Sequence, residues 1–278
     1  MKVRFLAFGL LCAVAAGCNS TTTPLAVVAS SPLSIGTGEQ RLLVALVDVA
    51  TNEFLATEDR EATLLLRDEN GTPVGTYDLE FVWTVPDERG IYSTTVDIPE
   101  AGVYQITVEA EGFNESGPSG FTAVDDPVNI FRGESAPATP TRTVGEFPDL
   151  ATISSDPDPD PALYELSVDE AISNGRPTLI VFATPAFCAS QACGPMLDQV
   201  KSLRPDYPGV DFIHVEVYRD LQVESATDLV VVDAVEDWGL PSEPWLYVVD
   251  EMGIVSSLFE GAVSDTDLAN ALEDVMAG

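Results

Sequence analysis

Residues 178–193 read TLIVFATPAFCASQAC, and this stretch decides the fold expected for the C-terminal half of the chain. The run over residues 178–184 predicts a buried strand, because it is short and almost continuously apolar. Cys188 and Cys193 follow it closely. A helix is predicted over residues 195–204, where apolar residues recur at helical spacing. The two cysteines are therefore expected between the end of a buried strand and the beginning of a helix.

The rest of this half alternates between helical and strand patterns. The capping box Ser167-Val168-Asp169-Glu170 predicts the beginning of a helix, and the cap at Ser264 predicts another. Apolar patterning predicts further strands over residues 212–217, 245–250 and 254–259 and a further helix over residues 231–238. This order of elements predicts an α/β sandwich over residues 163–278, with helices on both faces of the sheet.

This order, with a cysteine pair after the first strand and Leu240-Pro241-Ser242-Glu243-Pro244 before the third, resembles the thioredoxin superfamily. The resemblance covers residues 163–278 and implies an α/β thioredoxin-like sandwich. It implies that Cys188 lies at a helix N-terminus, where backbone N–H groups and the helix dipole stabilise a thiolate. It also implies a cis peptide bond before Pro244. The residues assigned to substrate binding on this basis are Pro244, Glu243, Thr184 and Pro185.

The cysteine spacing departs from the family's Cys-x-x-Cys pattern, because four residues separate Cys188 from Cys193. Residues five apart in a helix rise about 7.5 Å, whereas a disulfide needs Cα atoms within about 7 Å. We therefore expect Cys188 in the loop before a helix that begins at Gly194-Pro195, or a first turn that unwinds on oxidation. Many members also carry a buried acid where this chain has Phe182 or Val181, so a general base is missing.

Two other chemistries fit the same residues. Thr184-Pro185-Ala186-Phe187-Cys188 and Gln191-Ala192-Cys193 resemble the atypical, bacterioferritin-comigratory peroxiredoxins, which implies peroxidase activity. In that family, however, the threonine stands three residues before the reactive cysteine, and Thr184 stands four before it. An activating arginine comes late in that family's domain, but no arginine follows Arg219.

Copper handling is a third alternative, as in the thioredoxin-fold assembly factors of cytochrome oxidase, because two cysteines and a histidine suit Cu(I). The single histidine, His214, falls within the strand predicted over residues 212–217, much earlier than in those factors. We therefore expect His214 in the core, and we assign no metal and no cofactor. A fourth alternative is a redox-silent binding scaffold in which the pair forms a structural disulfide.

The N-terminus predicts export. Met1-Lys2-Val3-Arg4 provides a positive start, and residues 5–16 are an apolar run too short to span a bilayer. Ala15-Ala16-Gly17-Cys18 resembles the lipobox of bacterial lipoproteins, which implies cleavage of the signal peptide at residues 1–17 and lipidation of Cys18. The mature protein is then expected in the cell envelope, anchored to the membrane through Cys18.

The net charge excludes one class of binding partner, and the cysteine count leaves one pair that can form a disulfide. The formal net charge is −34, from 46 acidic residues against 12 Lys and Arg, which argues against nucleic acid as a partner because phosphates would be repelled. Cys12 leaves with the signal and Cys18 is used by lipid. Cys188 and Cys193 then remain, and they are expected to meet as a disulfide in an oxidising compartment.

The N-terminal half shows a different organisation. Residues 18–38 are rich in Ser, Thr, Pro and Gly and predict a flexible tether. Short β-type runs with turn signals such as Asn70-Gly71 predict a separate all-β sandwich over residues 39–124, resembling a bacterial immunoglobulin-like domain. Residues 125–162 are rich in Pro and Asp, and they predict a linker that holds the two domains apart.

Together these features predict an extracytoplasmic thiol-disulfide oxidoreductase. Its partners are expected to be protein thiols and disulfides of the cell envelope. Cys188 is expected to attack a substrate disulfide, and Cys193 is expected to resolve the mixed disulfide.

Overall fold

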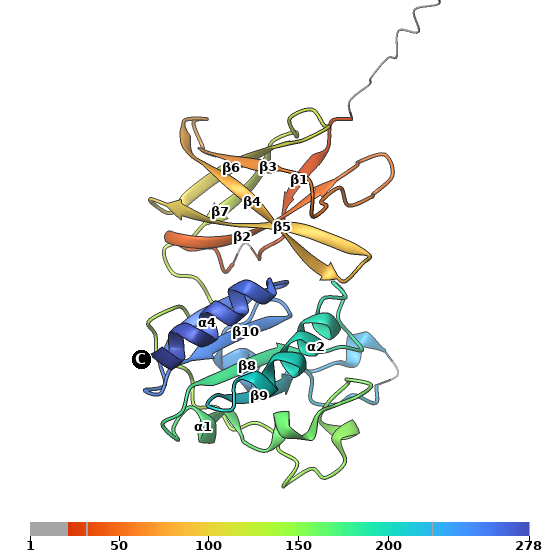
Figure 1. Ribbon diagram of the computed structural model, residues 1–278, viewed down its shortest axis with the longest axis vertical. Coiled ribbons are helices and arrows are strands. Elements are labelled where there is room, and N and C mark those ends of the chain that lie inside the picture. Colours follow the sequence, from red (N-terminus) through yellow and green to blue (C-terminus); the bar gives the residue numbers. More distant parts are fainter. Residues whose placement is uncertain (1–21, 32, 224, 278) are drawn as a thin grey trace, which may run out of the picture.

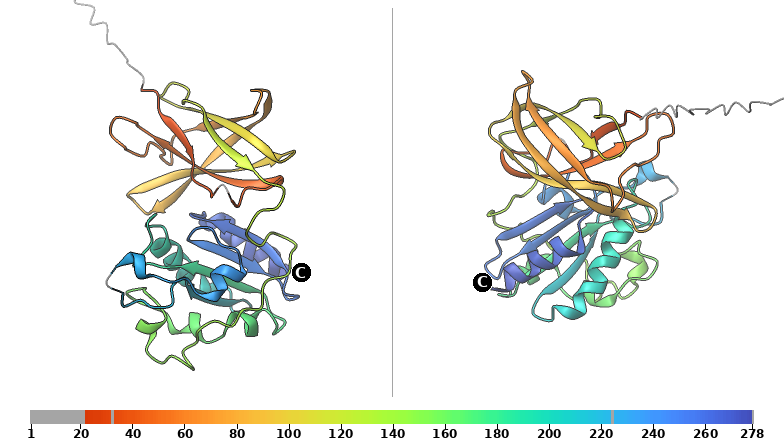
Figure 2. Two further views of the ribbon diagram at one scale, coloured as in Figure 1. Left: turned by 180° about the vertical axis from the view of Figure 1, so that it is seen from behind. Right: turned by 45° about the horizontal axis from the view of Figure 1, so that its top comes forward.

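The computed structural model describes residues 22–277 except residues 32 and 224 (Figure 1). The signal peptide predicted at residues 1–17 and the lipidation predicted at Cys18 lie outside these described residues. An N-terminal β-domain sits on one end of a C-terminal domain, as both views of Figure 2 also show. Within the described residues, no helix has the length and apolar character that crossing a membrane requires.

The β-domain is built on one antiparallel sheet with the strand order β1-β2-β5-β4-β3-β6-β7. Its strands are β1 (Leu25–Val28), β2 (Gly38–Val47), β3 (Ala62–Asp68), β4 (Pro73–Val85), β5 (Arg89–Ile98), β6 (Gly102–Ala110) and β7 (Ser119–Ala123). The long strand β4 pairs with β3 through its first half and with β5 through its second. The sheet therefore bends at β4 and folds back on itself, and a bridge between Leu25 and Gly117 brings β1 beside the chain that enters β7.

Alternation along the strands builds the core of the β-domain. In β3 every second residue is buried, with Leu64 and Leu66 fully enclosed. Val44 of β2 faces the same core, while its neighbours Leu43 and Ala45 point to the opposite side and are buried as well. The outer face of β2 is therefore covered by another part of the molecule.

The C-terminal domain has a four-stranded sheet with the order β11-β10-β8-β9. Its strands are β8 (Thr178–Ala183), β9 (Asp211–Glu216), β10 (Trp245–Val249) and β11 (Val255–Glu260). β8 and β9 are parallel, and β10 is antiparallel to both of its neighbours. Its helices are α1 (Val168–Ala171), α2 (Cys193–Leu203), α3 (Asp233–Asp237) and α4 (Asp265–Ala277), with short 3-10 turns at Leu150–Thr152, Pro161–Tyr164, Arg204–Asp206 and Ala226–Asp228.

The two faces of this sheet are covered unequally. The long helices α2 and α4 lie on the same face and pack against alternate residues of β8 and β10 (Figure 1). The short helices α1 and α3 lie on the other face, together with irregular chain around Ala136.

The predicted fold class, an α/β thioredoxin-like sandwich beside a separate immunoglobulin-like sandwich, is wrong. The structure is mostly β, with two sheets and 18% helix. On one face of the C-terminal sheet the helices are only four and five residues long. Val231 pairs with Tyr218, so the second of these helices begins only at Asp233, and Gly239, with a φ of 64°, follows it closely. In the β-domain, β4 pairs with β3 through its first half and with β5 through its second, so its two layers are joined into one sheet that folds over a common core.

Two segments that the sequence analysis treats as connectors are ordered. Residues 25–28, inside the predicted tether, form β1 and pair with β2. Residues 125–162 contribute buried side chains to both cores of the C-terminal domain. Aspartates of that segment are paired with cations on and after α2, since Lys201 Nζ lies 2.8 Å from Asp156 and Arg204 Nη2 lies 2.9 Å from Asp160. These ion pairs hold the segment against α2. Its Pro- and Asp-rich composition had instead predicted an extended linker that keeps the two domains apart.

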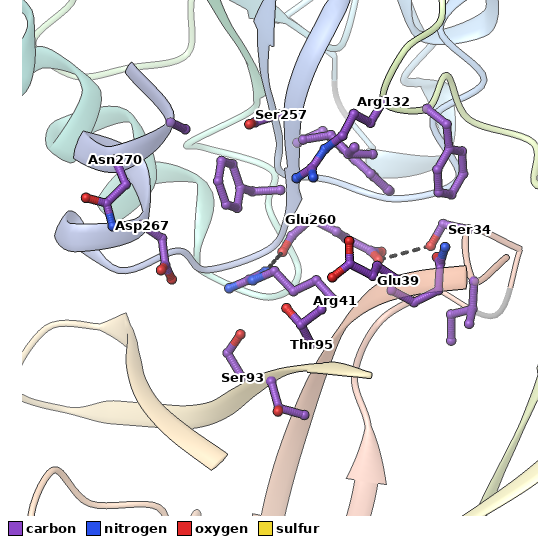
Figure 3. A pocket seen from close by; sticks show the side chains of 18 of the residues that line it. Ser34, Glu39, Arg41, Ser93, Thr95, Arg132, Ser257, Glu260, Asp267 and Asn270 are labelled. Atoms are coloured by element: carbon purple, nitrogen blue, oxygen red, sulfur yellow. Dashed lines mark hydrogen bonds between the residues drawn. The ribbon is translucent and has the colours of Figure 1, made fainter. Parts of the chain in front are cut away.

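The domains meet at Glu260, the last residue of β11. Its carboxylate accepts hydrogen bonds from the backbone N–H of Ser31 (3.0 Å to each oxygen) and from the hydroxyl groups of Ser34 (3.1 Å) and Ser242 (2.6 Å). Arg41 of β2 donates to the backbone carbonyl of Glu260 (3.0 Å). We call these five residues the Glu260 junction, and Figure 3 shows three of them, Ser34, Arg41 and Glu260.

Candidate functional site

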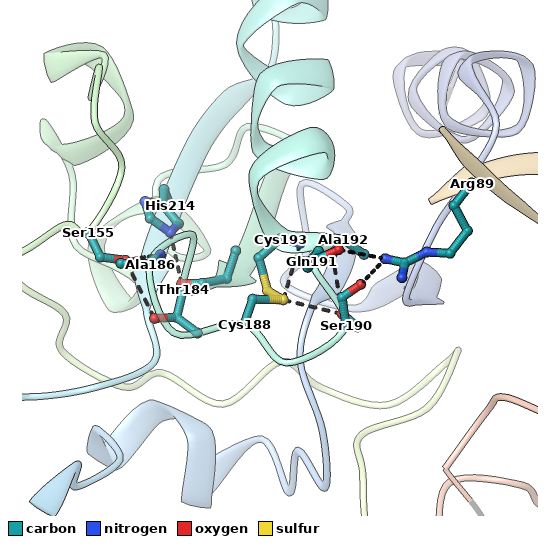
Figure 4. Close-up of a disulfide and its surroundings, with 11 residues drawn as sticks. Arg89, Ser155, Thr184, Ala186, Cys188, Ser190, Gln191, Ala192, Cys193 and His214 are labelled. Carbon is teal, nitrogen blue, oxygen red and sulfur yellow. Dashed lines mark hydrogen bonds between the residues drawn. A yellow bond between two sulfur atoms is a disulfide. The ribbon is translucent and has the colours of Figure 1, made fainter. Parts of the chain in front are cut away.

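A disulfide joins Cys188 and Cys193 beyond the C-terminal end of β8 (Figure 4). Their Cα atoms are 6.0 Å apart. Cys193 is the first residue of α2, and Cys188 lies in the loop before it. Of the two arrangements left open by the spacing, the structure has the one with Cys188 in the loop, and the helix begins one residue before Gly194.

The two cysteines differ in their exposure to solvent. Cys193 is 0% exposed and packs in the core between α2 and the sheet, whereas Cys188 is half-buried. The Sγ atom of Cys188 accepts a hydrogen bond from the backbone N–H of Cys193 (3.3 Å) and lies 3.2 Å from the Ser190 hydroxyl. An attacking group from solution can therefore reach Cys188, and the first turn of α2 directs a donor at that sulfur.

Two successive tight turns shape the loop that carries the disulfide, which we call the cysteine loop (residues 184–193). The N–H of Phe187 donates to the carbonyl of Thr184, and the N–H of Gln191 donates to the carbonyl of Cys188. Gln191 adopts a φ of 62°, which is uncommon for a residue with a side chain. The chain thus reverses twice before it enters α2, and this reversal brings the two cysteines together.

Thr184 and Pro185, which were assigned to substrate binding, lie at the base of the cysteine loop. Thr184 is 0% exposed, and its hydroxyl lies 3.4 Å from that of Ser155. The Ser155 hydroxyl also accepts the N–H of Ala186 (3.2 Å). Thr184 therefore holds the first residue of the cysteine loop in place. Pro185, the next residue, is half-buried.

The peptide bond between Glu243 and Pro244 is cis, which confirms that prediction. Pro244 is buried, and its carbonyl accepts the N–H of Gly261 (2.9 Å). Trp245 pairs with Phe182 in the antiparallel register of β10 and β8, so Pro244 lies at the end of the sheet where the cysteine loop begins. Its assignment to substrate binding stays a prediction.

Glu243 belongs to a group of titratable side chains at this end of the sheet. Burial raises the pKa of Glu243, and nearby Glu216 raises it further. Tyr218 lies beside both carboxyl groups, and the pKa of its phenol is raised mainly by burial. The ring of Tyr218 meets the ring of Phe187 edge-on at 6.0 Å. Through Phe187, the neighbour of Cys188 in the chain, this acidic group borders the disulfide.

Glu216 is a buried acid that the sequence analysis missed. It ends β9, is 5% exposed, and accepts the N–H of Ser155 at 2.8 Å. Burial raises the pKa of its carboxyl. β8 carries no acid, but the neighbouring strand β9 supplies this carboxyl at the end of the sheet where the cysteine loop begins. A charged residue inside the apolar run over residues 212–217 was the signal that could have identified it.

His214 is a core residue, as expected. Its Nδ1 lies 2.6 Å from the Tyr164 hydroxyl and its Nε2 lies 3.1 Å from the carbonyl of Ala183. Burial lowers the pKa of His214 to about 4. Both ring nitrogens are engaged, and no cluster of three or more His, Cys, Asp or Glu within the described residues could hold a metal ion. The copper alternative therefore has no support from this geometry.

Arg89, from the other domain, also reaches the cysteine loop. Its Nη2 donates to the carbonyl of Ser190 (2.5 Å) and to the side-chain oxygen of Gln191 (3.4 Å), as Figure 4 shows. No sequence signal pointed to this residue, because 101 positions separate Arg89 from Ser190.

Two cavities lie outside the cysteine loop. A cavity of about 610 Å³ opens around the Glu260 junction, and side chains of both domains line it (Figure 3). A smaller cavity of about 150 Å³ is lined in part by His214, Glu216 and Tyr218. The smaller one borders the acidic group near the disulfide, whereas none of the described residues around the larger one belongs to the cysteine loop.

No protein-family model matches the chain, and no curated protein matches it. Similar solved structures include the Lin-41 filamin domain, at 17% identity and a TM-score of 0.25, covering 38% of this chain and 100% of that one. A conjugative transposon lipoprotein from Bacteroides eggerthii is 18% identical with a TM-score of 0.20, covering 36% of this chain and 95% of that one. A lipoprotein from Bacteroides thetaiotaomicron is 11% identical with a TM-score of 0.20, covering 37% and 80%. Likenesses this low carry no inference about fold or function.

Proposed function

We propose that this protein exchanges disulfides with extracytoplasmic protein substrates through Cys188 and Cys193. The observation that supports this proposal is the unequal exposure of the two cysteines, since Cys188 is half-buried and Cys193 is fully buried. A substrate sulfur can reach one end of the disulfide only. This asymmetry favours exchange through a single mixed disulfide, because access decides which sulfur is attacked.

The proposed reaction begins with the reduced protein, in which both cysteines are free thiols. The Cys188 thiolate attacks one sulfur of a substrate disulfide, a new S–S bond forms, and the other substrate sulfur leaves as a thiolate. The Cys193 thiolate then attacks the Cys188 sulfur, the bond between Cys188 and the substrate breaks, and the second substrate thiolate is released. The substrate is reduced by two electrons and the protein is oxidised by two, and the same steps in reverse oxidise a dithiol substrate.

The start of α2 favours the thiolate form of Cys188. The Cys193 N–H points at the Cys188 sulfur, and this N–H belongs to the first turn of an 11-residue helix. Unpaired N–H groups and the helix dipole at such a terminus stabilise a negative charge and lower the pKa of a nearby thiol. The neighbouring Ser190 hydroxyl can donate a further hydrogen bond to the same sulfur.

Trapping with single-cysteine variants tests the proposal. With Cys188 retained, Cys193→Ser should accumulate a stable mixed disulfide with oxidised insulin or glutathione, because the resolving thiol is missing. Cys188→Ser should trap little, because Cys193 is enclosed. The reduced wild-type protein should reduce insulin, and both variants should fail to turn over. Equal trapping by both variants, or no insulin reduction by the wild type, would refute the proposal.

A second candidate is a binding scaffold in which the disulfide is structural. The observation that favours it is the anchoring of the cysteine loop by Ser155, which contacts Thr184 and Ala186. A structural disulfide of this kind should resist reduction in a glutathione buffer. In that case neither single-cysteine variant should form mixed disulfides while the protein stays folded.

The proposed compartment rests on the sequence around Cys18. We place the protein in the cell envelope, anchored by lipid on Cys18, where an oxidising environment would maintain or regenerate the disulfide. Expression of the full chain with a labelled fatty acid should label the wild type and leave Cys18→Ala unlabelled. Equal labelling of both would refute the anchor without affecting the exchange reaction.

A further inference from the structure

Arg89 bridges the β-domain and the cysteine loop. It is the first residue of β5, and its guanidinium reaches across the domain boundary to the Ser190 carbonyl and the Gln191 side chain. These two acceptors lie between Cys188 and Cys193 in the chain. The contact therefore falls on the segment whose shape decides whether the two sulfurs meet.

The β-domain orients Arg89 from its own side. The Nε atom of Arg89 donates to the Thr84 hydroxyl (3.2 Å), and that hydroxyl donates to the Arg89 carbonyl (2.8 Å). The guanidinium carbon lies 5.3 Å from the centre of the Phe54 ring, within the range of a cation–π contact. The direction in which Arg89 points is thus largely set before it meets the loop.

The domain that carries Arg89 is itself fixed in place. The outer face of β2 and β5 is buried, with Leu43 at 3% and Ile91 at 4% exposure. A Cβ atom added at Gly261 would come within 2.7 Å of the Leu43 side chain, which shows how closely β2 approaches the C-terminal domain. The part-buried Glu260 junction also fixes β2, through Arg41, against the C-terminal domain. Arg89 therefore acts from a rigid support.

The loop contacted by Arg89 needs such support. Gln191 holds a left-handed backbone with a φ of 62°, a conformation that costs free energy in a residue with a side chain and persists when surrounding contacts hold it. In the oxidised protein both the disulfide and Arg89 restrain this turn. After reduction the disulfide is gone, and Arg89 then still restrains residues 190–191 from outside the loop, while Ser155 holds only its first residues.

We infer that Arg89 is a positioning residue for the Cys188–Cys193 pair, and that through it the β-domain sets the redox equilibrium of the site. This inference rests on the proposed thiol-disulfide exchange. Arg89 holds residues 190–191 in the shape they have in the disulfide. The reduced thiols therefore stay close, ring closure is favoured, and the disulfide is harder to reduce.

The test is the equilibrium of the full soluble chain with glutathione redox buffers, read by alkylation of free thiols. Arg89→Ala should lower the equilibrium constant for disulfide formation by roughly three- to tenfold, and tenfold corresponds to about 30 mV toward easier reduction. Arg89→Lys, which keeps a charge and a donor, should recover part of the shift. Resolution of a mixed disulfide preformed on Cys188 should slow by a similar factor in Arg89→Ala.

Arg67→Ala is the matched control. Among the described residues, Arg67 donates to the Thr107 hydroxyl within the β-domain (3.0 Å) and not to the cysteine loop. Its replacement should leave the redox equilibrium unchanged. Thr84→Val offers a second variant that loosens Arg89 without removing it, and it should shift the equilibrium in the same direction by a smaller factor.

The outcomes separate this inference from the proposed function. An equilibrium constant in Arg89→Ala equal to that of the wild type, or shifted equally by Arg67→Ala, would overturn the positioning role even if insulin is reduced. A specific shift in Arg89→Ala with no insulin reduction by the wild type would support the positioning role and refute the exchange reaction, because the equilibrium is measured without a protein substrate.

Discussion

Among the described residues, the β-domain contacts the C-terminal domain at the Glu260 junction and at the cysteine loop, and these contacts differ in the depth of their hydrogen bonds and in the number of partners. At the Glu260 junction a half-buried carboxylate accepts part-buried hydrogen bonds from three serines, and burial raises its pKa. Burial of the facing Arg41 lowers the pKa of its guanidinium to about 10. At the cysteine loop a half-buried Arg89 makes two hydrogen bonds near the surface.

This difference determines what each contact can do. A part-buried junction in which both carboxylate oxygens accept hydrogen bonds costs more free energy to break than a surface contact, so it fixes the two domains relative to each other. A shallow contact is cheap to break and belongs to the part of the molecule that opens most easily. The disulfide lies at the shallow contact. The two domains are thus held together at the Glu260 junction, whereas the Arg89 contact can open, and the Cys188–Cys193 disulfide lies beside the contact that can open.

The largest effect is expected from breaking the fixed junction. Glu260→Ala leaves the Ser31 N–H, two hydroxyl groups and the buried charge of Arg41 without their acceptor or counter-charge. We expect the free energy of unfolding to fall by about 2–4 kcal/mol. Urea denaturation of the oxidised protein measures this fall.

Glu260→Gln is the control for that experiment, because its amide oxygen can still accept one of these bonds. It should lose less than half as much stability. A fall below about 0.5 kcal/mol in Glu260→Ala would show that the junction is no more demanding than an ordinary surface contact.

An intermediate effect is expected from pH at the cysteine end of the sheet. Burial raises the pKa of Glu216, so the folded state binds this proton more tightly than the unfolded chain does. The stabilisation is fully present below the unfolded pKa of 4.5 and is lost as pH rises through the higher folded pKa. Glu216→Gln, which keeps an acceptor for Ser155, removes this dependence.

Parallel urea titrations of wild type and Glu216→Gln check the sign. Relative to the variant, the wild type should lose unfolding free energy as the pH rises above the unfolded pKa of 4.5. The pKa of Glu260 is also raised by burial, although hydrogen bonds from serines and the charge of Arg41 oppose the rise. Glu260→Gln should therefore change the pH slope in the same direction as Glu216→Gln. A steeper loss in the variant than in the wild type would contradict the assignment.

Features that depend on neighbouring residues were predictable from the sequence. The capping box at Ser167 is present. Apolar spacing placed both ends of α2 to within two residues, and the cap at Ser264 placed the beginning of α4. The proximity of two thiols predicted the disulfide between Cys188 and Cys193. Each of these features depends on residues that are close together in the chain, so the sequence pattern alone is enough to predict it.

Features that depend on distant residues were not predictable in this way. The contact of Ser31 with Glu260 spans 229 positions, and charge pairing with Lys201 turned the expected extended linker into a docked segment. The helix predicted over residues 231–238 is shorter for a related reason, since apolar periodicity does not say that Val231 will pair with Tyr218 and that the helix will begin only at Asp233. Composition describes a segment by itself, but its partners decide whether it is a linker or part of a core.

The smallest effect is expected from Arg89→Ala on global stability, and its size decides whether the two contacts differ in kind. The guanidinium is half-buried and its bonds lie at the surface, so its loss should cost no more than about 0.5 kcal/mol with the disulfide intact. Amide hydrogen exchange at Gln191 and Cys193 should nevertheless accelerate, because the restraint on their turn is gone. A global loss above about 1.5 kcal/mol with unchanged exchange in the loop would make Arg89 a second fixed junction. Local acceleration without global loss means that the β-domain acts on the disulfide through a contact that contributes little to holding the fold together.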